Sequence, residues 1–373
     1  MLYRIVNIAA PLNVNQNMLA DLAAQRLSVL KSSILRVKVV KKSVDARKKR
    51  QIHFIFSLDA ELREPLRGKL PQGVTEVVPY RYQQSICKKR PHQRPIVVGS
   101  GPAGMLAALI LAQAGLDPLL LERGWNVERR REDVQNFWKT GILNLSSNVQ
   151  FGEGGAGTFS DGKLNTGTKD PRSRKVLEEF VEAGAPEEIL YEAKPHVGTD
   201  YLYHMVKNMR KRLESLGGQV LFGHRVIDIR GENGRVSSIA VRTENGESKE
   251  IPVQYAIFAI GHSARDTFEM LQRRGIAMEQ KPFSVGVRIE HLQSRINKTQ
   301  YGLFADSPFL GAADYKLAVH LKNGRGVYTF CMCPGGYVVG AASEKNRVVT
   351  NGMSEYARDG ENANSALLHM KTM

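Results

Sequence analysis

The sequence of 373 residues predicts an α/β fold organised around one strand–turn–helix–strand unit. Ile96–Val98 is a short β-branched run, as expected of a buried parallel strand. Residues 105–114 carry no charge, which indicates a helix buried against a sheet, and Gly115 follows where a helix-ending glycine is expected. Leu119–Leu121 is the second strand. This unit is of the Rossmann-like type.

Three glycines between the first strand and the helix have G-x-G-x-x-G spacing. Gly99 permits a tight turn, Gly101 lets a pyrophosphate approach the backbone, and Gly104 allows close packing of helix and strand. The helix N-terminus attracts the phosphate charge. The alternative is a glycine-rich turn with a purely structural role.

An acidic residue ends the second strand at the distance expected for a ribose contact, since Glu122 lies eighteen residues after Gly104. The unit therefore predicts dinucleotide binding. Its expected cofactor contacts are Gly99, Gly101, Pro102, Ala103, Gly104, Glu122 and Arg123.

Length and composition indicate a globular chain of two or three domains, with 42% hydrophobic and 24% charged residues. No apolar run is long enough to predict a membrane span, and the N-terminus lacks the order of a signal peptide. Three cysteines make no disulfide framework. A reducing, cytoplasmic location is expected.

The N-terminal quarter is strongly basic. Residues 1–94 hold 19 Lys and Arg against 6 Asp and Glu, which accounts for 13 of the net charge of +16. This region predicts a small α+β unit with strands at 3–8, 34–44 and 51–58. A helix over 16–29 is expected to begin after Asn15 as N-cap.

Two basic runs, 47–50 and 88–90, allow two interpretations of this unit. It could bind nucleic acid or an acidic partner through phosphate neutralisation. It could equally be a solvated basic face. The second is favoured, because no nucleic-acid motif is present and no aromatic residues interleave with the basic runs.

The next region predicts an amphipathic helix that includes Phe137 and Trp138, followed by a second glycine-rich loop at 151–167. Such a loop can bring its backbone close to a ligand, or it can be a mobile surface loop. Helices are expected at 172–193 and 200–216.

Residues 220–264 are β-rich. VLFG and RVIDI are expected to form one strand, bent or bulged at Gly223. Asn233-Gly234 and Asn245-Gly246 predict hairpin turns around strands at 237–242 and 248–253. A continuous apolar strand at 255–260 then leads into Gly261.

These features together resemble the FAD-binding half of two-dinucleotide-fold flavoproteins. More closely, the chain resembles a family of uncharacterised FAD-dependent proteins, often called NAD(FAD)-utilizing dehydrogenases. The matching stretches are KKSVDARKK, VVGSGPAGMLAALILAQAG, NVQFGEGGAGTFSDGKLNT, AIGHSARDTFEML, KPFSVGVRIEH, TFCMCPGGYVV and TNGMSEYARDGENAN.

The resemblance implies FAD as cofactor, with NAD(P)H as a possible electron donor. Gly99, Gly101 and Gly104 would hold the pyrophosphate, and Glu122 the adenosine ribose. Val226 would meet the adenine edge through its backbone. The glycines expected close to the flavin, to its ribityl chain or to the returning strand are Gly154, Gly155, Gly157 and Gly261.

The resemblance also implies a division into domains. A basic α+β domain (1–90) precedes the Rossmann-like FAD-binding domain (91–170 and 218–285), which contains a helical insertion (171–217). The remainder (286–373) would be a second, α/β substrate or cap domain. Family members carry a late strand–glycine–acid–helix segment that closes the FAD site. No such segment is found here, so a C-terminally truncated member is expected.

Two cysteines are candidates for redox chemistry. Cys331 and Cys333 are two apart on an expected strand, so their side chains would share a face. They could be buried structural thiols, which is favoured, or a thiol pair that exchanges electrons with a flavin. Half of a metal site is the third interpretation, but no other Cys or His lies within ten residues.

Acid–base candidates lie in VGVRIEH, where Arg288 and Glu290 share one face of a strand and His291 points to the other. They could hold an anionic substrate and transfer protons, or form a surface salt bridge. His262 could contact FAD or be a positioned loop residue. The absence of G-x-S-x-G, H-E-x-x-H and P-loop motifs gives no support to hydrolase function.

The function expected is that of an FAD-dependent oxidoreductase acting on a small molecule, without a metal, a membrane span or nucleic acid. One alternative is an NAD(P)-binding dehydrogenase that uses the same fingerprint. Another is a non-catalytic flavin- or nucleic-acid-associated protein. The substrate and the oligomeric state are not predicted.

Overall fold

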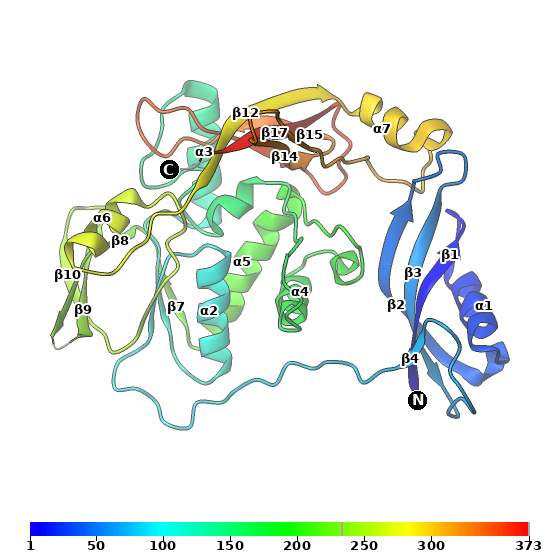
Figure 1. The fold of residues 1–373 in the computed structure, drawn as a ribbon. Coiled ribbons are helices and arrows are strands. Elements are labelled where there is room, and N and C mark those ends of the chain that lie inside the picture. Colours follow the sequence, from blue (N-terminus) through cyan, green and yellow to red (C-terminus); the bar gives the residue numbers. More distant parts are fainter. Residues whose placement is uncertain (233, 372–373) are drawn as a thin grey trace.

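The computed structural model describes residues 1–232 and 234–371. Figure 1 shows an N-terminal sheet at one side, a central parallel sheet with its helices, and a C-terminal sheet across the top. A long extended segment joins the first two regions beneath the molecule.

The N-terminal unit is an antiparallel sheet of order β2-β3-β1-β4 with one helix on its face. Its strands are β1 (Leu2–Ala10), β2 (Ile34–Asp45), β3 (His53–Leu62) and β4 (Val74–Glu76). The helix α1 (Gln16–Leu27) begins as predicted, because the Asn15 side chain accepts a hydrogen bond of 3.0 Å from Met18 N. A short 3₁₀ turn, η1 (Lys31–Ser33), precedes β2. The prediction missed β4.

The central sheet is parallel, with strand order β11-β5-β6-β7. Its strands are β5 (Ile96–Val98), β6 (Leu119–Leu121), β7 (Gln219–Leu221) and β11 (Ala256–Phe258). Each strand is three residues long, and β5 and β6 are fully buried. The predicted strand–turn–helix–strand unit is therefore confirmed.

Helices cover this sheet. α2 (Pro102–Gln113) packs with α5 (Thr199–Ser215) and α4 (Ser173–Glu182) in one apolar core that includes Val97 and Leu120 of the sheet. The prediction of one helix over 172–193 is wrong: α4 ends at Glu182, and a 3₁₀ turn η3 (Glu187–Leu190) follows Gly184 and Pro186. α3 (Val127–Thr140) precedes the second glycine-rich loop, and the 3₁₀ turn η2 (Gly155–Phe159) lies within it.

A separate antiparallel sheet of order β10-β9-β8 lies beside the parallel one. Its strands are β8 (His224–Glu232), β9 (Arg235–Thr243) and β10 (Ser248–Pro252). VLFG and RVIDI therefore do not form one strand. Gly223, at φ +67°, separates β7 from β8, which belong to different sheets. The β9–β10 turn is confirmed, whereas Asn233 of the other predicted turn lies outside the described residues.

The C-terminal region is an antiparallel sheet of order β12-β17-β14-β13, with a β15–β16 hairpin. The bounds are β12 (Phe283–Leu292), β13 (Ala318–His320), β14 (Gly326–Cys333), β15 (Gly336–Gly340), β16 (Thr350–Ser354) and β17 (Asn362–Lys371). Helix α6 (Arg265–Arg273) precedes this sheet, and α7 (Gln293–Tyr301) with η4 (Gly302–Phe304) follows β12. The prediction had no strand at β17, which pairs with both β12 and β14.

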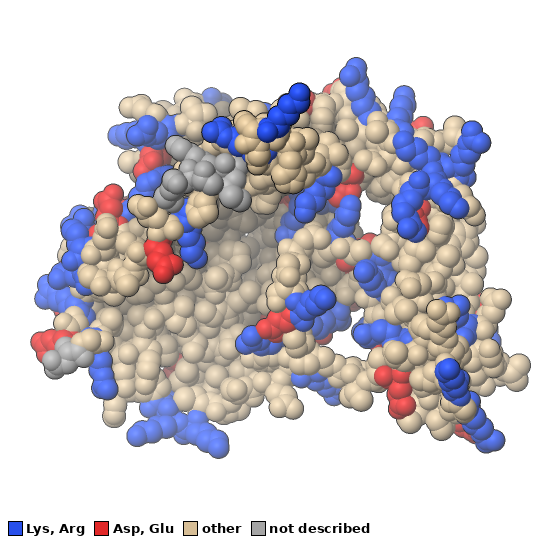
Figure 2. All heavy atoms as spheres, viewed as in Figure 1, with Lys and Arg blue, Asp and Glu red and all other residues tan. Residues whose placement is uncertain are grey.

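The N-terminal unit contacts the rest of the chain through β2 and through Leu310, which packs against its core. Lys42 exchanges backbone hydrogen bonds of 2.8 Å with Tyr191 and Ala193, and its ammonium lies 2.8 Å from Glu192 Oε1. On the face shown in Figure 2, Lys and Arg side chains are spread over several regions as well as over this unit. No helix among the described residues is both long and apolar enough to cross a membrane.

Candidate functional site

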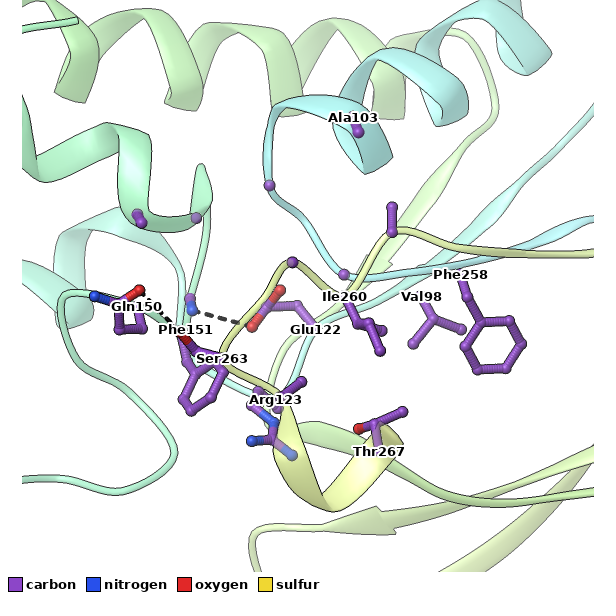
Figure 3. Close-up of a pocket in the computed structure, with 18 of the residues that line it drawn as sticks. Val98, Ala103, Glu122, Arg123, Gln150, Phe151, Phe258, Ile260, Ser263 and Thr267 are labelled. Atoms are coloured by element: carbon purple, nitrogen blue, oxygen red, sulfur yellow. Dashed lines mark hydrogen bonds between the residues drawn. The ribbon is translucent and has the colours of Figure 1, made fainter. Parts of the chain in front are cut away.

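A cavity of about 480 Å³ opens at the carboxyl ends of β5 and β11. Figure 3 shows the N-terminus of α2, marked by Ala103, above the cavity, with Glu122 and Phe151 along its side. Val98, Phe258 and Ile260 supply an apolar wall. Carboxyl ends of parallel strands are the usual ligand position in this fold class, and the volume lies within the range of cofactor pockets.

The first glycine turn lines the cavity with backbone. Gly99 has φ +96°, and a Cβ there would lie 2.5 Å from the carbonyl oxygen of Ala259. A Cβ on Gly104 would overlap the carbonyl oxygen of Gly99. At Gly101 the nearest atom to such a Cβ is Gly155 Cα at 3.9 Å, so this glycine faces open space. The three glycines thus serve the turn, the packing and the cavity, respectively.

The second glycine-rich loop lies against the first. Gly154 N donates a hydrogen bond of 2.9 Å to Ser100 O, and a Cβ on Gly155 would lie 3.0 Å from Gly101 Cα. Gly155 and Gly157 line the cavity, whereas Gly154 does not. The two loops together form a backbone-lined cradle at the N-terminus of α2. The alternative of a mobile surface loop is not favoured by these contacts.

Glu122 joins the glycine loops. Its side chain is buried, and Oε2 accepts hydrogen bonds of 2.8 Å from both the backbone N and the Oγ of Ser100. Oε1 accepts from Gly124 N at 2.9 Å and from Gly152 N at 3.0 Å. A carboxylate has about four acceptor positions, so protein donors occupy them here. A ribose contact at Glu122 would have to share or replace one of these bonds.

Arg130 anchors the second loop, and the sequence analysis did not single it out. Its fully buried guanidinium donates to the backbone carbonyls of Asn148, Val149, Gly152, Glu153 and Gly155 at 2.6–3.3 Å. Burial lowers the pKa of Arg130 to about 10, against the charges of Glu122 and Glu153, so the side chain stays charged at neutral pH. Val127, Arg130 and Val134 share the buried face of α3. Their helical spacing is the sequence feature that could have identified Arg130 as buried.

The mouth of the cavity holds polar side chains from three elements. The Arg123 guanidinium lies 4.3 Å from the centroid of the Phe151 ring and 2.5 Å from Asp266 Oδ2. Ser263 Oγ donates to Gln150 Oε1 at 3.1 Å. The sequence analysis missed these partners, because they come from segments that become neighbours only in the fold.

The structure places most of the predicted cofactor residues around this one cavity. They are Gly99, Gly101, Pro102, Ala103, Glu122, Arg123, Gly155, Gly157, Val226 and Gly261. His262 also lines it, as do His224 and Arg225, which the prediction did not include. His224 and Arg225 directly precede Val226 at the start of β8, so the strand that brings Val226 to the cavity brings them as well.

The catalytic candidates do not line this cavity. Arg288 and the two cysteines come together in the C-terminal sheet, where Arg288 Nη1 donates a hydrogen bond of 3.2 Å to Cys331 O. Glu290 is exposed on β12, and His291 Nε2 lies 2.7 Å from the Tyr315 hydroxyl. The described residues hold no cluster of three or more Cys, His, Asp or Glu suited to a metal ion.

These residues fit a dinucleotide with a pyrophosphate. A Cβ at Gly101 would occupy the space in front of the α2 N-terminus, where a phosphate would bind free backbone N–H groups. The apolar wall suits an aromatic ring system, and a small number of charged and polar side chains, among them Glu122 and Arg123, also line the cavity.

Three family models match the chain. One is described as an FAD binding domain and matches residues 94–265. A second, an FAD-dependent protein C-terminal domain-like family, matches residues 282–372, and a domain of unknown function matches residues 2–61. FAD is therefore the cofactor of the domain that contains the cavity.

An uncharacterised protein of Clostridium beijerinckii is 48% identical over 373 residues, which cover 99% of this chain and 69% of the relative. Among solved structures, glycerol-3-phosphate dehydrogenase from Bacillus halodurans complexed with FAD is 12% identical, with a TM-score of 0.38. The match covers 77% of this chain and 49% of that one. A flavin-dependent brominase is 14% identical over 74% of this chain and 56% of that one, with a TM-score of 0.39. The chain thus spans about half the length of these two structures.

Proposed function

The chain belongs to a family of uncharacterised FAD-dependent proteins, and we propose that it is an oxidoreductase that binds FAD in the cavity at the N-terminus of α2. The observation that carries the assignment is the cradle formed by the two glycine-rich loops in front of that helix. Bound FAD supplies hydride or electron transfer, while the protein supplies binding and electrostatics. The substrate is a small molecule of unassigned class.

Backbone groups would bind the pyrophosphate. α2 has Gly101 as N-cap and Pro102 at its first position, and no side chain caps it. Its first free N–H groups and the positive end of its dipole therefore face the cavity, where a phosphate would satisfy them. Gly155 and Gly157 complete the cradle without side chains that could exclude the cofactor.

Glu122 would position the cofactor in two ways. It ties Ser100 to Gly152, which fixes the distance between the two glycine loops. It also lines the cavity at the end of β6, where a ribose hydroxyl could donate to it. Val226 follows at the start of β8, where its backbone would meet the adenine edge.

The cavity wall would exclude water from the ring system. Val98, Phe258 and Ile260 are apolar, and Arg123 with Gln150 lies at the mouth. We propose a cytoplasmic location, for which the three free cysteines are suited. An electron donor such as NAD(P)H would approach this mouth, because the chain carries only one dinucleotide fingerprint.

The test is a pair of matched valine substitutions. Gly101→Val places a side chain where the pyrophosphate would lie, so we expect protein that is folded but nearly free of flavin. Gly167→Val serves as the control, because a Cβ there meets no atom within 4 Å and Gly167 does not line the cavity. The measurement is flavin absorbance per chain after purification. Full flavin content in Gly101→Val would contradict the proposed site.

A further inference from the structure

A pair of thiols lies outside the cavity, at the end of β14. Cys331 has φ +47°, and the pairing of β14 with β17 shifts register between Phe330 and Cys333. This bulge interrupts the regular alternation predicted from the sequence. The Cys333 thiol donates a hydrogen bond of 3.4 Å to the carbonyl oxygen of Cys331, so the two residues remain in contact across the bulge. Cys333 is fully buried, whereas Cys331 is partly exposed.

Two cationic side chains converge on the thiols. Lys163 Nζ lies 3.6 Å from Cys333 Sγ, and Asp161 Oδ2 holds the same ammonium at 2.7 Å. Arg288 is the second: its Nη1 donates a hydrogen bond of 3.2 Å to Cys331 O. A Cβ on Gly352 would overlap the Arg288 guanidinium and lie 2.8 Å from Cys333 Sγ, so the absence of a side chain at Gly352 leaves room for both groups.

These surroundings favour one thiolate in the pair. The neighbouring Cys333 thiol lowers the pKa of Cys331, and the charges of Lys163 and Arg288 add to this effect against burial. The neighbouring Cys331 and burial raise the pKa of Cys333. The two shifts have opposite directions, so Cys331 is the sulfur on which the negative charge is favoured. A partly exposed thiolate beside cations and a second thiol is characteristic of reactive cysteines rather than inert buried ones.

The second glycine-rich loop connects the thiols with the FAD cavity. Gly157 lines the cavity, and Lys163, six residues later, contacts Cys333. Between them Phe159 O accepts a hydrogen bond of 3.1 Å from Asn351 Nδ2, and Phe159 packs against Val339 of β15. The same loop therefore contacts the cofactor cavity and the C-terminal region.

We propose that Cys331 and Cys333 form a redox-active dithiol that exchanges two electrons with the flavin, an inference that rests on the proposed FAD function. The Cys331 thiolate and the Cys333 thiol form an S–S bond as the Cys333 S–H bond breaks. Two electrons and that proton pass to oxidised flavin. Reduced flavin returns them in the reverse direction and opens the disulfide. A bridge across one intervening residue is strained and readily reduced, which suits a catalytic rather than a structural disulfide.

The test is an anaerobic reductive titration of the FAD-loaded full chain after oxidation with diamide and removal of the excess. We expect the wild type to take up about four electrons per flavin, and Cys331→Ser and Cys333→Ser about two. Free thiols, counted after denaturation, should fall by two on oxidation of the wild type and by none in either variant. Cys87→Ser is the matched control and should titrate like the wild type, since the Cys87 thiol donates to the carbonyl oxygen of Lys89, away from the other two thiols.

A wild-type protein that takes up about two electrons per flavin and retains its thiols after diamide would overturn the dithiol. Since this readout uses the unmodified chain, it decides the question even if Cys333→Ser does not fold. Protein that binds no FAD but loses two thiols on oxidation would contradict both the proposed function and the flavin as electron partner. Protein that binds FAD but retains its thiols would contradict only the dithiol.

Discussion

At the scale of single residues, Arg130 explains how a loop so rich in glycine keeps one conformation. Five backbone carbonyls between Asn148 and Gly155 accept hydrogen bonds from this one buried guanidinium. A planar group with five N–H donors suits such a set of acceptors, whereas lysine could not reproduce it. The cavity therefore depends on a residue that does not touch it.

Replacing Arg130 by Met is expected to destabilise the protein by about 3 kcal/mol or more, because buried carbonyls lose their donors. Flavin content should fall as well, since the loop that lines the cavity is released. Arg129→Met is the matched control: Arg129 is half-exposed, pairs with Glu244 at 3.1 Å and should cost less than about 1 kcal/mol. Urea denaturation measures the free energy of unfolding of both variants. Equal stabilities of the two variants would argue against this role.

Asp161 links the loop to the C-terminal region and gives a pH-dependent contribution to stability. It accepts hydrogen bonds from Arg358 at 2.5 and 2.9 Å and pairs with Lys163. Burial opposes its charge, but Arg358 and Lys163 prevail and lower the pKa of Asp161 from 3.8 to about 2. A lowered pKa in the folded state stabilises the protein above the unfolded value, and this contribution is lost as pH falls from 3.8 towards 2.

We therefore expect Asp161→Asn to lower the free energy of unfolding at pH 6 by about 2 kcal/mol. The difference from wild type should narrow when the measurement is repeated at pH 3. Urea denaturation at the two pH values provides the comparison. A stability difference that stays the same at both would show that Asp161 does not contribute through its charge.

At the scale of elements, two glycines between β5 and α2 have different roles: Gly104 allows the helix to pack against the turn, and Gly101 leaves space for a ligand. A Cβ on Gly104 would overlap the Gly99 carbonyl, whereas a Cβ on Gly101 would stand 3.9 Å from its nearest neighbour. Gly104→Ala should therefore destabilise the flavin-free protein by about 2 kcal/mol through overpacking. Gly101→Ala should change its stability by less than about 0.5 kcal/mol. Thermal or urea unfolding decides, and a stable Gly104→Ala protein would contradict the packing role of this glycine.

The elements also show what the sequence could predict. The strand–turn–helix–strand unit and the β9–β10 hairpin were predicted correctly, because glycine spacing and apolar runs act locally. The strand β17 was missed, since NANSALLHMK has no clear alternation and its pairing with β12 and β14 is set by tertiary contacts. The separation of β7 from β8 depends on which sheet each strand joins, which no local pattern records.

The candidate site was predicted on the same basis. Gly99, Gly101 and Glu122 follow from spacing, and the structure brings them to one cavity with Gly155 and Val226. Arg130 was not found, because a buried arginine in a helix with three adjacent arginines reads as an exposed charge run. The two cysteines were recognised as a candidate pair, but Lys163 was not, since it is 170 residues from Cys333 in the sequence.

At the scale of the whole molecule, the second glycine-rich loop connects the regions. It contacts the first glycine turn through Gly154 and the C-terminal region through Asn351. The basic N-terminal unit instead contacts the chain through Lys42, which pairs with Glu192, and through Leu310, which packs on its core. None of the described residues that line the cofactor cavity comes from that unit.

The central claim is that the cavity at the N-terminus of α2 holds FAD, and the most direct measurement is the identity and amount of nucleotide released from the purified chain. Denaturation followed by chromatography and mass determination should yield FAD, at about one per chain in protein reconstituted with FAD. Gly101→Val treated in the same way should yield almost none. A colourless wild-type chain that takes up no FAD, and binds NAD alone, would contradict the account.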